Sequence, residues 1–186
     1  STRVRSSAAS DVYKRQIRER TVYPLKIYAS TQTGRQYLLC YAYQVRHLVF
    51  IRVDTIRKVV PGNVEKKHEV YAGYFNKFRD HLWGVSVGPG YSMDHIEMTI
   101  RVDEGEGHIP QRLEREKRNG RVQQIDENTY LFSADVYDAA EMLPWLRTFI
   151  GRIIKLECSN QSVVDTFYAD LDAMIRMYGG DDDAVQ

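Results

Sequence analysis

The sequence contains few of the residues that mark an extracellular, membrane-spanning or metal-dependent protein. Only two of its 186 residues are cysteines, Cys40 and Cys158, and no Cys-x-x-Cys or Cys/His spacing is present that would hold a metal. We therefore expect free, buried thiols and no cofactor, as in a reducing cytoplasm. No apolar run approaches the roughly 20 residues of a membrane span, and no signal-peptide pattern opens the chain. The sequence predicts a soluble cytoplasmic protein without membrane contact.

Motifs of the common enzyme classes are also absent. The five histidines occur singly, without an HExxH or HxH pattern, and neither a GxGxxG nor a GxxxxGK[ST] loop is present. Gly34, Gly88 and Gly90 lie in turn-like surroundings. No nucleophile–base pair or carboxylate pair can be placed within reach of one another. The chain is therefore predicted not to be an enzyme.

The formal net charge of +1 conceals an uneven distribution. Residues 1–66 contain 13 Lys/Arg and 4 Asp/Glu, a net charge of +9, whereas residues 67–186 contain 13 and 21, a net charge of −8. Such an asymmetry suggests that the basic half faces a polyanion. The alternative is that the opposite charges face each other between domains.

The basic half has the two-residue period of β-strands. Residues 1–20, rich in small and basic residues, are predicted to be a linker or poorly ordered arm, and we assign no function to them. Within residues 21–63, the run QYLLCYAY places Leu38, Cys40 and Ala42 on one face and its tyrosines on the other. Several short strands in so few residues predict a small barrel or twisted sheet.

The acidic half mixes helices and strands. Residues 64–81 have a helical period and are predicted to connect two domains, and LWGVSVG reads as a short strand. Residues 82–179 then have the order β-α-β-β-α-β, which is typical of a ferredoxin-like domain. A final helix carries an apolar stripe that includes Leu171 and Ile175, and residues 180–186 form an acidic tail.

A sheet face with aromatic and guanidinium groups suits single-stranded nucleic acid, because bases stack on aromatic rings and phosphates pair with arginine. The alternative is that the tyrosines are half-buried with the hydroxyl at the surface, and that Arg52 pairs with Asp54. The candidate ligand-binding residues are Arg35, Tyr37, Tyr41, Arg46, Arg52 and Arg57, with Tyr28 and Tyr43 as further aromatic candidates.

The segment YPLKIYASTQTGRQYLLCYAY, followed by FIRVDTIRKV, resembles a WYL domain. Gln36-Tyr37-Leu38 occupies the Trp-Tyr-Leu triplet, so tryptophan is replaced, whereas the Arg-x-Asp-x-Ile signature is intact at residues 52–56. The stretch from LWGVSVG through ENTYLF, LPWLRTFIG and IIKLEC is similar to the C-terminal extension of WYL regulators. Together the resemblances cover about residues 20–178.

The resemblance implies an α+β protein: an Sm-like, SH3-type β-barrel, then a ferredoxin-like domain and a C-terminal helix. It also implies a ligand-sensing module of a bacterial transcription regulator, a homodimer whose ligand is single-stranded nucleic acid or a small anionic effector. Such regulators carry an N-terminal winged helix-turn-helix, for which fewer than 25 residues leave no room here, so we expect a fragment, a truncated member or a standalone module.

By position, the resemblance assigns the ligand surface to Tyr37 and Arg52, and strand alternation extends it to Arg35 and Tyr41. Asp54 is expected to orient Arg52, because a carboxylate would repel phosphate. The alternative function is a protein-interaction or dimerisation module with no small ligand.

Overall fold

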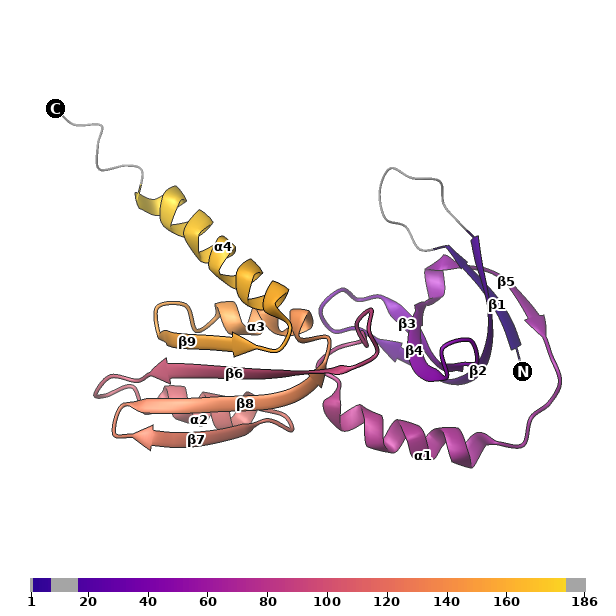
Figure 1. Cartoon of the computed structure of the whole chain (residues 1–186), viewed down its shortest axis with the longest axis horizontal. Coiled ribbons are helices and arrows are strands. Elements are labelled where there is room, and N and C mark those ends of the chain that lie inside the picture. Colours follow the sequence, from indigo (N-terminus) through magenta and orange to yellow (C-terminus); the bar gives the residue numbers. More distant parts are fainter. Residues whose placement is uncertain (1, 8–16, 180–186) are drawn as a thin grey trace. The chain divides into compact units, whose positions relative to one another are not determined.

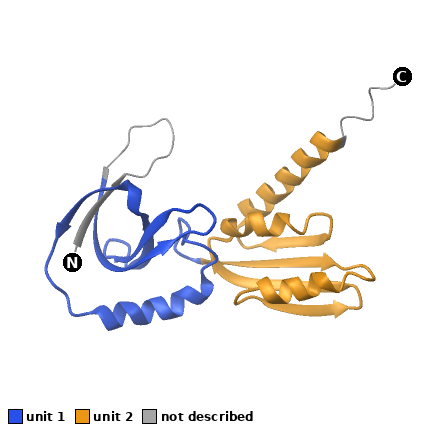
Figure 2. Cartoon of the chain, turned by 180° about the vertical axis from the view of Figure 1, so that it is seen from behind, with its two compact units in different colours: residues 1–92 blue, residues 93–186 orange. Residues whose placement is uncertain are grey.

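A computed structural model describes residues 2–7 and 17–179 (Figure 1). The predicted acidic tail and residues 8–16 of the predicted linker lie outside the described residues. The chain divides into two compact units, residues 1–92 and 93–186 (Figure 2). This division falls later than the predicted boundary after residue 81, because Trp83 and Val87 are buried and Tyr91 packs against the core of the first unit.

The first unit contains a five-stranded antiparallel sheet in the order β4-β3-β2-β1-β5. A 3-10 turn, Val53–Thr55, separates β4 from β5, and helix α1 follows the sheet. The elements are β1 Thr2–Ser7, β2 Ile17–Ala29, β3 Gln36–Ala42, β4 His47–Arg52, β5 Ile56–Pro61, α1 His68–Phe78 and a 3-10 turn Arg79–His81.

Strand β1 corrects the prediction that residues 1–20 are a linker. Residues Thr2–Ser7 pair with β2 on one side and β5 on the other, so β1 lies inside the sheet. Its backbone groups find partners on both edges, and this stabilises an extended segment whatever its composition. A short basic run with small residues carries no sign of such pairing.

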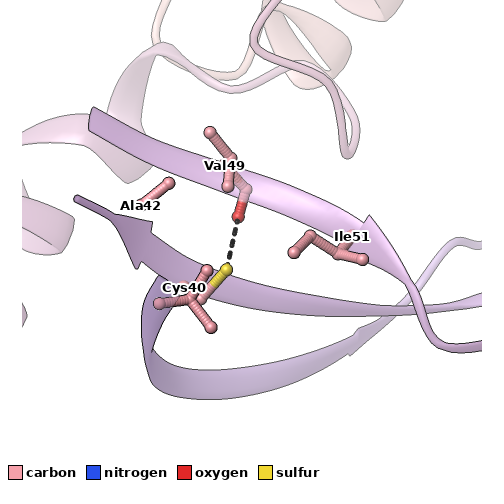
Figure 3. Close-up of a cluster of buried hydrophobic side chains, with 5 residues drawn as sticks. Cys40, Ala42, Val49 and Ile51 are labelled. Atoms are coloured by element: carbon pink, nitrogen blue, oxygen red, sulfur yellow. Dashed lines mark hydrogen bonds between the residues drawn. The ribbon is translucent and has the colours of Figure 1, made fainter. Parts of the chain in front are cut away.

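A cluster of buried side chains lies on the face of β3 that carries Cys40 and Ala42. Cys40 and Ala42 pack with Val49 and Ile51 of β4 (Figure 3), and Val22 belongs to the same cluster. The Cys40 thiol lies 3.8 Å from the Val49 carbonyl, and burial raises its pKa to about 12. Cys40 is therefore a buried, unreactive free thiol, whereas Cys158 is free and only partly buried.

Helix α1 covers the opposite face of the same sheet. Leu39, which points away from the Cys40 cluster, is fully buried, and Tyr71 and Phe78 of α1 are buried as well. Rings of α1 contact rings of β2, β3 and β4. The helix that was predicted as a connector therefore also packs on the sheet of the first unit. The prediction that LWGVSVG is a strand is wrong, because Leu82 forms an isolated bridge and bends follow it.

The second unit has the predicted β-α-β-β-α-β order followed by a helix, with an antiparallel sheet in the order β7-β8-β6-β9. Trp145 packs on the buried Phe132 at 5.0 Å between ring centroids and donates a hydrogen bond to Glu116, so both shorter helices lie on one face. The elements are β6 Met93–Arg101, α2 His108–Glu116, β7 Arg121–Asp126, β8 Thr129–Tyr137, a 3-10 turn Ala139–Met142, α3 Leu143–Arg147, β9 Ile153–Cys158 and α4 Gln161–Gly179.

Helix α4 is packed only along its first turns. Val163, Val164 and Phe167 are buried, whereas Ile175 and Tyr178 are exposed. The predicted stripe is therefore half core and half surface. Within the described residues, no helix combines the length and the apolar composition that crossing a membrane requires.

Candidate anion-binding site

Arg35, Tyr37 and Arg52 lie together where β3 begins and β4 ends. Tyr37 and Arg52 are direct partners across the two strands. Arg35 precedes β3, at the end of a turn in which Gly34 adopts the left-handed φ of 66°. The Ser30 amide donates to the Arg35 carbonyl at 2.8 Å and closes this turn. The β2–β3 turn and the β3–β4 register thus bring three of the six predicted residues to one corner.

Asp54 holds the Arg52 guanidinium in place. Arg52 Nε donates to Asp54 Oδ1 at 3.0 Å, and Nη2 donates to Oδ2 at 2.6 Å. This hydrogen bonding raises the pKa of Arg52 and lowers the pKa of Asp54, with a further lowering from the charge of Arg35. Asp54 is therefore ionised and orients Arg52, which is the role expected from the sequence.

The Nη1 edge of the Arg52 guanidinium is left for a ligand. Bidentate pairing occupies Nε and Nη2, and no partner of Nη1 is found among the described residues. A third of the Arg52 side chain is exposed, and Arg35 is exposed beside it. Within the described chain, Asp54 pairs with Arg52 alone and Arg35 acts on it only through its charge, so two guanidinium groups near one carboxylate leave the corner with a net positive charge. Such an arrangement can bind a phosphate or carboxylate oxygen through charge-assisted hydrogen bonds.

Tyr41 does not lie on an open surface. Its ring stacks on Tyr71 at 4.6 Å between centroids with an interplanar angle of 28°, and on Tyr74 at 6.2 Å and 26°. Tyr28 likewise packs on Phe50 and Phe75. The tyrosine face is therefore the packing surface of α1. Tyr37, at the end of the strand, is half-buried and has no ring contact within the described part of the chain.

Tyr43 has a polar role that sequence reasoning missed. Its hydroxyl donates to Glu65, and it accepts a hydrogen bond from the Tyr71 hydroxyl at 3.4 Å. Burial and the Glu65 contact raise the pKa of Tyr43, which keeps the phenol protonated. Glu65 also pairs with Lys67 at 2.8 Å. The aromatic residues of α1, spaced three and four apart, were the sequence signal that this helix packs on the sheet.

Arg46 lies away from the corner, and no contact joins Arg57 to Arg35, Tyr37 or Arg52 among the described residues. Arg46 occupies the β3–β4 turn with a φ of 52°, at the opposite end of the six-residue strand β4 from Arg52. Six residues of strand span about 20 Å, too far for both to hold one small anion. Arg57 is exposed in β5, at the bulge between Lys58 and Ile56 in the pairing with β1.

The second unit offers a polar hollow of about 300 Å³ beside Arg101 and Arg152, but its charges are paired. Arg152 pairs with Glu106 and holds the pKa of that carboxyl at about 2, and Arg101 pairs with Asp103 at 3.0 Å. Among the described residues, no group of three His, Cys, Asp or Glu side chains could hold a metal. The corner at Arg52 is therefore the stronger candidate.

Comparison with known proteins finds likeness in structure only. No family model matches the chain, and no curated protein matches it. A structure titled a CRISPR Cas-related protein is 13% identical, with a TM-score of 0.57 over 95% of this chain and 48% of that chain. Proteasome accessory factor B/C (PafBC) of Arthrobacter aurescens is 15% identical, with a TM-score of 0.46 over 95% of this chain and 25% of that one.

The chain thus spans about half and about a quarter of the lengths of these two proteins. At such low identities the likeness concerns the fold. The fold, a mainly β unit followed by an α/β unit with an antiparallel sheet in each, is thus similar to that of the CRISPR Cas-related protein.

Proposed function

We propose that this chain is the ligand-sensing module of a WYL-type transcription regulator. In this proposal it binds single-stranded nucleic acid or a small anionic effector at Arg35, Tyr37 and Arg52, and no catalytic step is involved. The observation that carries the proposal is the Arg52 guanidinium, held by Asp54 with Nη1 unused beside a second arginine and a tyrosine ring.

The finer fold assignment belongs to the same proposal. A short 3-10 turn between β4 and β5 supports an Sm-like, SH3-type barrel, although no pairing of β4 with β5 occurs among the described residues. The strand order β7-β8-β6-β9, with α2 and α3 as crossovers, supports a ferredoxin-like second unit.

The geometry favours recognition of the anion over recognition of a base. Arg35 and Arg52 each offer hydrogen-bond donors to a phosphate, whereas Tyr37 is the one candidate ring without a ring contact in the described chain. Stacking on one ring is worth roughly 1–3 kcal/mol. Affinity for single-stranded DNA should therefore come mostly from charge and fall steeply with salt.

Fluorescence anisotropy with labelled single-stranded DNA at about 50 to 200 mM salt tests the proposal. Each lost phosphate contact should flatten the slope of log K against log salt by about 0.7, so Arg35→Ala and Arg52→Ala should each weaken binding and flatten the slope. Arg115→Ala, an exposed arginine of the second unit, is the matched control. If all three variants weakened binding equally, the DNA would not bind specifically at the corner formed by Arg35, Tyr37 and Arg52.

Asp54→Asn separates orientation from charge. It removes the negative charge but keeps one oxygen that can accept from Arg52, so binding of single-stranded DNA should strengthen if charge dominates. If no DNA binds at low salt, a thermal-shift screen of nucleotides and other small anions tests the effector version. A ligand at a hundred times its dissociation constant stabilises the folded state by about 2.7 kcal/mol.

A protein-interaction or dimerisation module is the second candidate. The observation that favours it is the exposed apolar end of α4, where Ile175, Met177 and Tyr178 are 60%, 72% and 81% exposed. Apolar surface of this kind is common at protein interfaces. Light scattering over a range of concentrations, with and without nucleotide, distinguishes the two: self-association that ignores nucleotide favours the second.

A further inference from the structure

We propose that the free edge of β7 pairs with β7 of a second copy of this chain, joining the two β7-β8-β6-β9 sheets about a two-fold axis. The inference comes from the second unit alone and does not depend on the anion site. It names the partner as an identical strand, running antiparallel, and assigns the interface to Arg121–Asp126.

Strand β7 is an unprotected edge. It pairs with β8 on one side, and no strand pairs with its other side among the described residues. Natural edge strands are usually guarded by a central charge, a proline or a covering segment. Between its charged ends, β7 contains only Val122, Gln123, Gln124 and Ile125, and Ile125 is 52% exposed.

A bulge near the end of β7 decides which side chains share a face. Arg121 and Gln123 lie opposite Ser133 and Leu131 of β8, and the register then shifts so that Asp126 lies opposite Thr129. Residues 129, 131 and 133 alternate along β8 and share a face. Arg121, Gln123 and Asp126 are therefore on one face of the sheet.

A two-fold axis through Gln123 makes the strand complementary to itself. Gln123 then faces its own copy, and Val122 faces Gln124 of the partner. Arg121 faces the partner's bulge, where Asp126 lies on the same face, so each dimer gains two Arg–Asp pairs. Arg121 has no ion-pair partner among the described residues, and Asp126 accepts hydrogen bonds from the Asn128 amide at 2.9 Å and from the amide and hydroxyl of Thr129, to which a partner's guanidinium would be added.

The other face of the paired strands would lie against a groove. A hollow of about 590 Å³ runs between α2 and β7, and Val122 and Gln124 of the partner would extend along it. Its lining residues are Pro110, Gln111, Glu114, Arg115, Val122, Gln124 and Tyr130. One six-residue strand with a shallow groove buries less than a standard interface of roughly 1,600 Å². We therefore expect a dissociation constant of micromolar order.

The opposite edge, β9, does not have the same properties. Lys155 and Glu157 place charges in the middle of that strand, and they already pair with each other at 2.9 Å. Central charges guard a strand edge against pairing. This edge therefore supplies a matched control.

Sedimentation equilibrium of the whole chain over about 5 to 500 µM tests the inference. Arg121→Asp should weaken the dimer about tenfold, because two attractive pairs become repulsive. Asp126→Asn, which keeps an oxygen for the Asn128 amide, should weaken it less, by about threefold. The double variant Arg121→Asp with Asp126→Lys should restore the dimer, and Lys155→Asp should leave it unchanged.

Several outcomes would overturn the proposal: a monomer at every concentration, a dimer unaffected by Arg121→Asp, or a double variant that fails to recover. Loss of the dimer in Lys155→Asp or Ile175→Asp, with Arg121→Asp unaffected, would move the interface to β9 or α4. Circular dichroism confirms that each variant is folded. Single-stranded DNA affinity of Arg121→Asp should equal that of the unmodified chain at protein concentrations below the dimer range, which keeps this test separate from that of the anion site.

Discussion

Gly120, the residue before β7, is predicted to tolerate no side chain. A Cβ atom added there would lie 2.5 Å from Cε2 and 2.9 Å from Cζ of the Phe132 ring, and 2.9 Å from the Lys117 carbonyl oxygen. Carbon atoms in contact normally lie about 3.5–4.0 Å apart. Gly120→Ala must therefore displace either a core ring or the end of α2.

Neither neighbour can move freely. Phe132 is fully buried and packs edge-on against Trp145. The Lys117 carbonyl accepts the Gly120 amide at 2.8 Å, which fixes the turn. Overpacking of this kind costs about 1–3 kcal/mol. For a unit of this size, each kcal/mol lowers Tm by about 4–8 °C, so a cost of about 2 kcal/mol corresponds to about 8–16 °C.

The same substitution at Gly73 should have the opposite effect. Gly73 is an exposed position in α1, and an added Cβ meets nothing within 4 Å. Alanine in a helix interior is favoured over glycine by about 0.8–1.0 kcal/mol. Differential scanning calorimetry of the two variants measures both changes. An unchanged Tm for Gly120→Ala would refute the packing around Phe132, and a lowered Tm for Gly73→Ala would refute the exposed position of that glycine.

Two further predictions concern ionisable groups. Hydrogen bonds from His95 to Asp135 at 2.8 Å and to Glu97 at 3.1 Å raise the pKa of His95 above its ordinary 6.5. The stabilisation is complete below about pH 6.5 and is lost as pH rises through the raised pKa. His95→Ala should therefore reduce the dependence of thermal stability on pH across that window. The effect should be no more than about 1 kcal/mol, because the site is exposed. Tyr43→Phe removes the phenol that donates to Glu65 and should destabilise the first unit by about 1 kcal/mol in urea unfolding. No change in either measurement would contradict the corresponding contact.

The sequence pattern predicted those parts of the fold that depend on neighbouring residues, namely strand faces and the order of elements in the second unit. Alternation in QYLLCYAY correctly separated the face of Cys40 and Ala42 from the face of the tyrosines, and the helix termini identified the β-α-β-β-α-β order. Such patterns do not predict which distant segments pair as strands. Thr2–Ser7 is a strand because β2 and β5 flank it, a long-range requirement invisible in its composition.

The site was predictable in part for the same reason. Tyr37, Arg52 and Asp54 are neighbours through strand register and a short turn, which sequence spacing encodes. Tyr41 shares the face of Tyr37, and alternation alone cannot show that a helix some 30 residues later covers it. The helical period of residues 64–81 did not show which residues of α1 are buried, and these are Tyr71 and Phe78.

The covering of Tyr41 by α1 bears on what the module could discriminate. Because its ring stacks on Tyr71 and Tyr74 of α1, Tyr41 is half-buried and offers less ring surface to a nucleobase. A homopolymer of thymine and one of adenine should then compete almost equally for the protein, and inorganic polyphosphate should displace both. A binding site of this kind would respond to the amount of anionic polymer and would discriminate little between base sequences.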